Sequence, residues 1–212
     1  MLFWFIATIE SAFLIKLNQT LDLSEQQLID CCNQDNKHLC FGCGGGWLPE
    51  AMNYVLKSGV ELETDYTYAG KQEKCEDSHQ KVHLNIKGFR QLTHPSTEDE
   101  MMRAILANGP VAVFIDSQGS DFHFYKYLIF FPKNFGNYFL IFHLFIQRSG
   151  VMHIKGNHSG DHYVTIIGWG PDYWLIKNSW GTEWGENGFG RMARGVNLRG
   201  INNYVYYPVL WF

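Results

Sequence analysis

The sequence predicts an α+β fold, because helix signals dominate its first half and strand signals its second half. Capping patterns and glycine stops mark helices before residue 110, and runs of β-branched and aromatic residues follow it. We therefore expect two subdomains, a helical one at residues 1–85 and a β-rich one at residues 86–212.

The first predicted helix covers the apolar segment from residue 3 to residue 17. Its apolar positions (3, 6, 7, 9, 13, 14 and 17) have the spacing of a largely buried helix. A signal peptide is the alternative reading of this segment, but no basic stretch precedes it and Glu10 interrupts it. We favour the core helix and expect no leader or pro-segment in the sequence.

Three further helices carry start and stop signals. Capping-box patterns at Ser24–Gln27 and Thr97–Glu100 begin two of them. Pro49 suits the first turn of the third, and Gly59 is a plausible stop. Asn108–Pro110 ends the helix that begins at Thr97. Four strands are predicted after it: Val111–Ile115, Tyr163–Trp169, Tyr173–Lys177 and Val205–Tyr207.

Composition narrows the function classes. With 46% hydrophobic residues and a net charge of −4, the chain is neither collagen-like nor strongly disordered. Seventeen basic and 21 acidic side chains give no overall electrostatic argument for nucleic-acid binding.

The five cysteines allow two readings, a zinc site or a disulfide framework. Cys40–Cys43 is the only CxxC spacing, and no second pair or nearby HxxxH completes a zinc site. Disulfides in a secreted or lysosomal protein fit better, and we predict no metal site. Because the number of cysteines is odd, one of them is then left without a disulfide partner. The five cysteines are Cys31, Cys32, Cys40, Cys43 and Cys75.

A possible catalytic pair lies in the second half, where His162 opens one predicted strand and Asn178 closes the next. A lone histidine is usually structural, and an asparagine before serine usually marks a turn. Together they allow a sharper reading, in which the amide oxygen accepts the ring N–H and orients a general-base imidazole. Trp180 would shield the pair from water.

The segments Asp161–Gly170 and Trp174–Phe189 resemble the papain-like cysteine peptidases, the cathepsin family. Leu23–Cys31, Cys43–Gly46 and Asn108–Val111 resemble the family too, in the right order. The resemblance implies a papain-like fold, in which a helical left domain and an antiparallel barrel-like right domain enclose the active-site cleft.

The resemblance also implies roles for individual residues. His162 would be the acid and base and Asn178 its orienting partner, with Trp180 and Asp161 in support. The backbone of Gly45 and Gly46 would form hydrogen bonds with the substrate backbone. Val111 and Tyr163 would line the pocket for the second residue before the scissile bond, and the large side chain of Tyr163 would narrow that pocket.

The family nucleophile is a cysteine that would fall directly before Met1, and the oxyanion glutamine would lie further upstream. We therefore expect the chain as written to be truncated and inactive. By resemblance Cys31 pairs with Cys75, and Cys43 lacks a partner that would precede the nucleophile. Cys32 and Cys40 are candidates for an extra short loop.

The second anomaly is residues 127–148, which interrupt a family pattern between Tyr125–Lys126 and Ser149–Val151. Fourteen of these 22 residues are Phe, Ile, Leu or Tyr, which is what an AT-rich intron would encode. Removing them shortens the nucleophile-to-His162 spacing from 162 to 140, within the roughly 130–150 expected. The alternative is a genuine inserted loop or membrane-contact element.

Three functions compete. The first is a cysteine endopeptidase of which this chain is an incomplete version; the alternative is a non-enzymatic pseudo-peptidase that binds peptides or partners through the cleft. The third is a membrane-associated interaction protein using residues 127–148, although Pro132 and Gly136 break this segment and make it a poor membrane span. The presence of His162, Asn178 and Trp180 together favours the first function. For it we expect a peptide or protein substrate, no cofactor, a monomeric state and a lysosomal or extracellular location.

Overall fold

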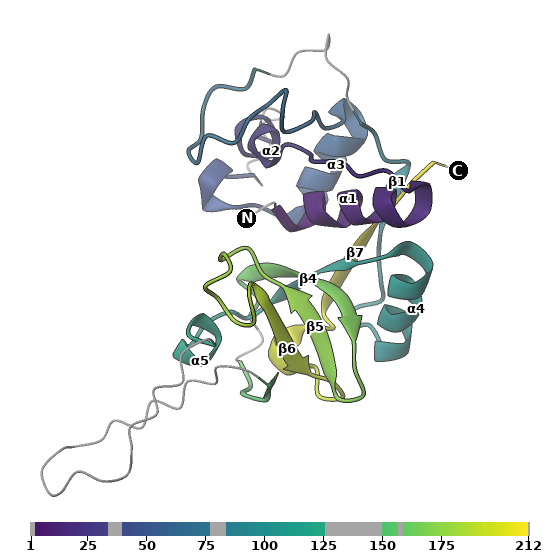
Figure 1. The fold of residues 1–212 in the computed structure, drawn as a ribbon, viewed down its shortest axis with the longest axis vertical. Coiled ribbons are helices and arrows are strands. Elements are labelled where there is room, and N and C mark those ends of the chain that lie inside the picture. Colours follow the sequence, from purple (N-terminus) through teal and green to yellow (C-terminus); the bar gives the residue numbers. More distant parts are fainter. Residues whose placement is uncertain (1–2, 34–39, 77–83, 126–149, 157–158, 212) are drawn as a thin grey trace, which may run out of the picture.

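The computed structural model describes residues 3–33, 40–76, 84–125, 150–156 and 159–211. Figure 1 shows the helices of residues 3–58 gathered in one part of the molecule and the strands of residues 162–193 in the other. The predicted insert at 127–148 lies outside the described residues. The α+β class predicted from the sequence is confirmed.

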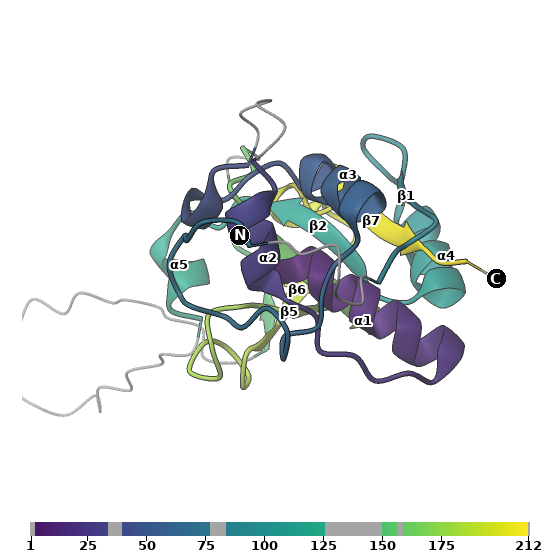
Figure 2. The ribbon, with the colours of Figure 1, turned by 90° about the horizontal axis from the view of Figure 1, so that it is seen from above.

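The helical part contains α1 (Phe3–Leu17), α2 (Glu25–Cys31) and α3 (Leu48–Ser58), with the short 3-10 turn η1 (Gly42–Gly44) before α3. Helix α1 lies against the strands β2 (Val111–Ile115), β4 (His162–Trp169) and β7 (Tyr204–Val209). In the view from above, α1 runs alongside β2 and β7 (Figure 2). Its first turns are buried, but its last turn exposes Leu14, Ile15 and Leu17, so the prediction of a largely buried helix is wrong there.

The two capping patterns form to different extents. At Thr97–Glu100 the capping box is complete and starts α4 (Glu98–Asn108). At α2 only half of it forms, because the Ser24 hydroxyl accepts from the Gln27 N–H while the Gln27 side chain accepts from the Glu61 N–H at 2.7 Å. Gln27 therefore ties α2 to the segment after α3 instead of closing the cap.

A seven-stranded sheet has the order β1-β7-β2-β4-β5-β6-β3, and all pairs are antiparallel except β3 with β6. The structure adds three strands that the sequence reading missed, and a short helix α5 (Ser120–His123). The bounds of the strands are β1 (Gly88–Gln91), β2 (Val111–Ile115), β3 (Val151–Met152), β4 (His162–Trp169), β5 (Tyr173–Lys177), β6 (Phe189–Ala193) and β7 (Tyr204–Val209).

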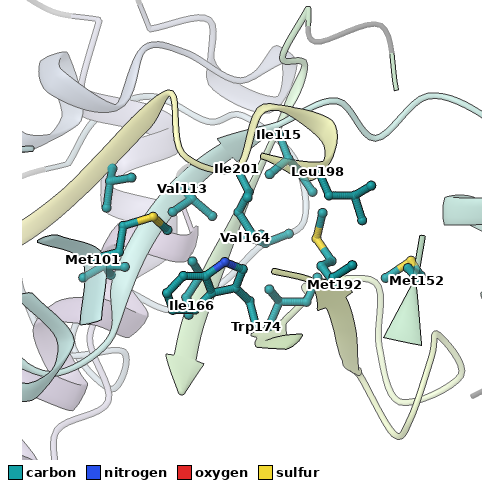
Figure 3. Packing of buried hydrophobic residues seen from close by; sticks show 14 of the residues in the cluster. Met101, Val113, Ile115, Met152, Val164, Ile166, Trp174, Met192, Leu198 and Ile201 are labelled. Atoms are coloured by element: carbon teal, nitrogen blue, oxygen red, sulfur yellow. The ribbon is translucent and has the colours of Figure 1, made fainter. Parts of the chain in front are cut away.

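Two hydrophobic cores lie on opposite faces of the sheet. In β2, Ala112 belongs to the core under the helices, whereas Val111 and Val113 belong to the second core, as the two-residue period of a strand requires. Figure 3 shows this second core, where Trp174 and Met192 pack with residues of α4 and of the turn η2 (Leu198–Gly200). Strands β2 and β4 therefore carry side chains that face both parts of the molecule.

Candidate active site

Strand pairing brings His162 and Asn178 together. His162 is the first residue of β4, and Asn178 directly follows the last residue of β5. The two strands are antiparallel with Thr165 opposite Lys177, so the start of β4 lies beside the segment that follows β5. On its other side β4 pairs with β2, where Ile115 is opposite His162.

The two side chains share a hydrogen bond of 2.9 Å between His162 Nε2 and Asn178 Oδ1. His162 is 1% exposed and Asn178 is 5% exposed, so solvent hardly competes for this bond. The Asn178 oxygen also accepts from the Ser179 N–H at 2.8 Å. Because an amide oxygen can only accept, His162 Nε2 carries the proton here, and Nδ1 is the nitrogen left for proton exchange in the neutral ring.

Aromatic rings surround the pair on one side. The Trp180 ring is tilted over the His162 ring at a centroid distance of 4.9 Å, and Phe122 presents its edge to both. Trp184 donates its indole N–H to the Phe122 carbonyl at 2.8 Å. This apolar cover excludes water from the hydrogen bond between His162 and Asn178.

Burial lowers the pKa of His162 below its ordinary value, because desolvation disfavours the charged ring. The bond to Asn178 and the neighbouring carboxylate of Asp161 act in the opposite direction and raise the pKa. Asp161 is itself held by the Ser117 N–H, which donates to its Oδ1 at 2.7 Å.

The ring of a second histidine, His123, stacks on the ring of Trp180. Its ring lies 4.8 Å from that of Trp180, with an angle of 28° between the planes. His123 is exposed, at the end of α5. The sequence reading missed both Phe122 and His123, because a four-residue helix leaves no periodic signal.

The predicted substrate-binding residues differ in how far their polar groups are already used inside the protein. The backbone N–H of Gly45 donates to Gly42 and its carbonyl accepts from the Phe41 N–H at 2.8 Å, so both groups are used within the turn. Gly46 follows it and is half-buried. Tyr163 is buried, and its hydroxyl lies 3.5 Å from the Leu48 N–H at the start of α3.

Val111 does not share a pocket with Tyr163, so this prediction is corrected. Val111 is fully buried in the second core, whereas Tyr163 belongs to the core under the helices. The β2 residue opposite Tyr163 is Phe114, and their rings are 4.6 Å apart. The alternation of side chains along β2 could have identified Phe114 from the sequence.

Phe114 is part of an aromatic group that the sequence reading also missed. Its ring lies 6.1 Å from that of Trp47, which precedes α3, and 6.1 Å from that of Tyr204 at the start of β7. Phe114 also fills the space beside Gly160, where an added Cβ would come within 2.3 Å of the ring. This group occupies the place next to Tyr163 where a substrate pocket was expected.

Two disulfides are present, Cys31–Cys75 and Cys32–Cys40, and Cys43 is free and exposed. The first ties α2 to the segment after α3, and the second closes a loop before η1. Within the described part of the chain, no group of three or more His, Cys, Asp or Glu side chains could hold a metal ion.

An acidic cavity of about 410 Å³ lies next to Asn178, and Ser179 lines it. Its carboxylates are Asp22, Glu25 and Glu63. Burial, reinforced by the nearby carboxylates, raises the pKa of Glu25 to about 7. Burial also raises the pKa of neighbouring Glu10.

Comparisons with known proteins agree on one family. The model of the papain family cysteine proteases matches residues 3–209. A protein named "Cysteine protease" from Blomia tropicalis is 35% identical over 95% of this chain and 56% of its own length. The chain spans about half the length of the curated relatives it matches.

Solved structures of related proteins have the same fold. One, from work on antibody cross-reactivity between the mite allergens Blo t 1 and Der p 1, has a TM-score of 0.82 and 33% identity, covering 98% of this chain and 63% of its own. Another is a cysteine protease of Carica candamarcensis in complex with E-64, with a TM-score of 0.80 and 30% identity. That match covers 98% of this chain and 86% of the other.

Proposed function

The chain belongs to the papain family of cysteine proteases, and we propose that His162 and Asn178 are the acid–base pair of a thiol-dependent peptidase. The observation that carries the proposal is the buried 2.9 Å bond between His162 Nε2 and Asn178 Oδ1. A neutral amide orients the ring without adding a charge, so the imidazole keeps its capacity to take and return a proton. A protein that only binds peptides has no chemical need for this pair.

In this mechanism a cysteine thiolate attacks the carbonyl carbon of a peptide bond. The protonated ring of His162 gives its proton from Nδ1 to the leaving amine, and a thioester with the acyl part of the substrate remains. Neutral His162 then takes a proton from water, whose oxygen attacks the thioester and regenerates the thiolate. Asn178 keeps the ring in place through both steps, and Trp180 limits access of bulk water.

Substrate would bind along the turn before α3. Since both backbone groups of Gly45 are used within the turn, we assign the backbone contacts with substrate to Gly46. Phe114 and Tyr163 would form the floor for the second residue before the scissile bond, in place of the Val111–Tyr163 pocket. Because these rings fill the space, the floor should favour a small side chain at that substrate position.

We propose that residues 1–212 contain no thiol suited to this reaction and that this polypeptide alone is inactive. Four of the five cysteines form disulfides, and Cys43 lies in η1, on the turn before α3. The expected nucleophile position directly precedes Met1. Acyl transfer would then require a cysteine joined to the chain at that point.

Two proteins test the proposal. The first is residues 1–212, and the second is the same chain preceded by a family-type segment whose nucleophilic cysteine directly precedes Met1. With a fluorogenic dipeptide amide and a thiol reductant, we expect hydrolysis that is blocked by a thiol-directed inhibitor in the second protein only. His162→Ala should then reduce kcat by about 100-fold or more.

Folding of each protein is checked by circular dichroism, so that loss of activity is not confused with loss of structure. Hydrolysis by residues 1–212 would contradict the proposed inactivity. Absence of hydrolysis in the folded extended protein, or equal rates with His162→Ala, would contradict the catalytic assignment. Peptide binding without turnover in that protein would indicate the non-enzymatic alternative.

The two disulfides support a secreted or lysosome-like location, since such bonds persist in oxidising compartments. Among the described residues, the structure has no helix that is both long and apolar enough to cross a membrane. We propose a peptide or protein as the substrate and a monomer as the working form.

A further inference from the structure

The ring of Trp180 lies between the proposed catalytic pair and a second histidine in the chain of aromatic contacts. The rings of His162 and Trp180 lie 4.9 Å apart, and those of Trp180 and His123 lie 4.8 Å apart. Trp180 therefore contacts two imidazoles. His162 is 1% exposed, whereas His123 is exposed to solvent.

The carboxylates of Asp121 and Asp161, on elements next to His123, have partners of their own. On the same helix, Asp121 is paired with the guanidinium group of Arg199, which is itself 1% exposed. His162, the other imidazole in contact with Trp180, has Asp161 beside it, and the carboxylate of Asp161 accepts from the Ser117 N–H. On the loop that carries Trp180, Glu183 is exposed and has an interaction of its own.

The alternation of side chains along β4 separates the acyl side of the proposed cleft from its leaving side. Successive residues of β4 point to opposite faces, so His162 contacts Trp180 whereas Tyr163 contacts Phe114 and the start of α3. The acyl side of a substrate is assigned above to Gly46 and Tyr163. The leaving side, which follows the scissile bond, therefore extends towards Trp180 and His123.

We propose that His123 is a specificity-determining residue that recognises a carboxylate on the leaving side of the substrate. The carboxylate would be the C-terminus of a short peptide or an acidic side chain just after the scissile bond. This inference rests on the proposed function, because it uses the same cleft. An imidazole stacked on an indole has a limited choice of orientations, and its ring N–H can donate to a carboxylate oxygen.

Binding to residues 1–212 tests the inference without the complication of turnover. Acetyl-trialanine with a free carboxylate and its C-terminal amide are titrated at pH 5, and NMR signals of the isotope-labelled histidine rings report binding. We expect the free acid to bind about threefold more tightly than the amide, the size of an exposed ion pair.

Three variants locate the effect. His123→Gln should abolish the preference, and His123→Lys should retain it. His153→Gln changes another exposed histidine, after β3, and should leave the preference intact. Equal binding of both peptides to the unmodified chain, or a preference that survives His123→Gln, overturns the role of His123 alone. Failure of both peptides to bind overturns the peptide cleft, and the proposed function with it.

Discussion

The hydroxyl of Tyr125 donates a hydrogen bond of 2.6 Å to the carbonyl oxygen of Gly150, so the two residues that flank residues 126–149 are in contact. The same Glu186 oxygen lies 3.1 Å from the Tyr125 hydroxyl and 3.1 Å from the Gly150 nitrogen. Glu186 is fixed in turn by Arg191 at 2.7 Å. Both flanks therefore belong to one polar cluster of the folded protein.

This contact leads to a prediction about residues 127–148. Their deletion leaves Lys126 and Ser149 to join Tyr125 to Gly150 through three Cα–Cα steps of about 3.8 Å each. Three such steps are long enough to join Tyr125 to Gly150 while the Tyr125 hydroxyl keeps its hydrogen bond to the Gly150 carbonyl oxygen. We expect the deletion variant to fold with a melting temperature no lower than that of the full chain, measured by circular dichroism.

Tyr125→Phe is the matched control, because it removes the hydroxyl and keeps the ring packing against Trp184. It should lower the free energy of unfolding by about 1 kcal/mol in both backgrounds. A deletion variant that loses cooperative unfolding would show that residues 127–148 are needed by the fold. Sequencing of transcripts across codons 126–149 tests the intron hypothesis separately, and the uniform presence of the segment would remove it.

The acidic cavity predicts that stability falls as pH rises. Burial and the carboxylates of Glu10, Glu63 and Asp22 raise the pKa of Glu25 from 4.5 to about 7. The folded state therefore binds more protons than the unfolded state between these values, and the free energy of unfolding decreases as pH rises through this window. Glu25→Gln should reduce the fall in melting temperature between pH 5 and pH 8 by about 2–4 °C.

Glu76→Gln is the control, because it removes an exposed carboxylate elsewhere on the surface. It should leave the pH dependence unchanged. The same slope in Glu25→Gln as in the parent would show that Glu25 keeps its ordinary titration in the folded protein. Calorimetry at five or six pH values gives the comparison.

The cover over His162 predicts how its proton affinity responds to mutation. Burial is the largest cause of its lowered pKa, and Trp180 supplies part of that burial. Trp180→Ala should admit water and move the pKa of His162 back up towards 6.5. NMR titration of the ring carbon signals measures this directly, with the exposed His153 as an internal reference. An unchanged or lower pKa in Trp180→Ala would mean that the tryptophan does not shield the ring.

The fold and the site differ in how far they could be predicted from the sequence. The positions of β2 and β5 were predicted to the residue, because β-branched and aromatic runs between turn residues leave few alternatives. Strand β6 was missed, since Phe189–Ala193 contains a glycine and an arginine and its stability comes from its pairing with β5. The exposed end of α1 was missed because a helix that is apolar all round does not show which face is covered.

The two-residue period of side chains along β2 distinguishes Phe114 from Val111 on the sequence alone. Residues 111, 113 and 115 face the second core, so 112 and 114 face the helices and Tyr163. What the sequence could not show is that Trp47, Phe114 and Tyr204 come together from three separate segments. Only the fold places them in one group beside the proposed cleft.

This aromatic group predicts the substrate preference of the extended, cysteine-containing protein. The ring of Phe114 lies against Tyr163 and fills the space beside Gly160, so the floor of the subsite is raised. Substrates with alanine or glycine as the second residue before the scissile bond should therefore be cleaved more efficiently than those with leucine or phenylalanine.

Phe114→Ala should reverse that order by opening the space, with a change in the ratio of kcat/KM values of about tenfold or more, the effect of one or two methylene groups in an apolar pocket. Val111→Ala is the matched control, because Val111 is fully buried in the second core and does not face the subsite. It should lower stability by about 1–3 kcal/mol through the cavity it leaves, and keep the preference for small residues. If Val111→Ala changes the preference and Phe114→Ala does not, the subsite lies on the other face of β2, and the assignment of Phe114 and Tyr163 to substrate binding is wrong.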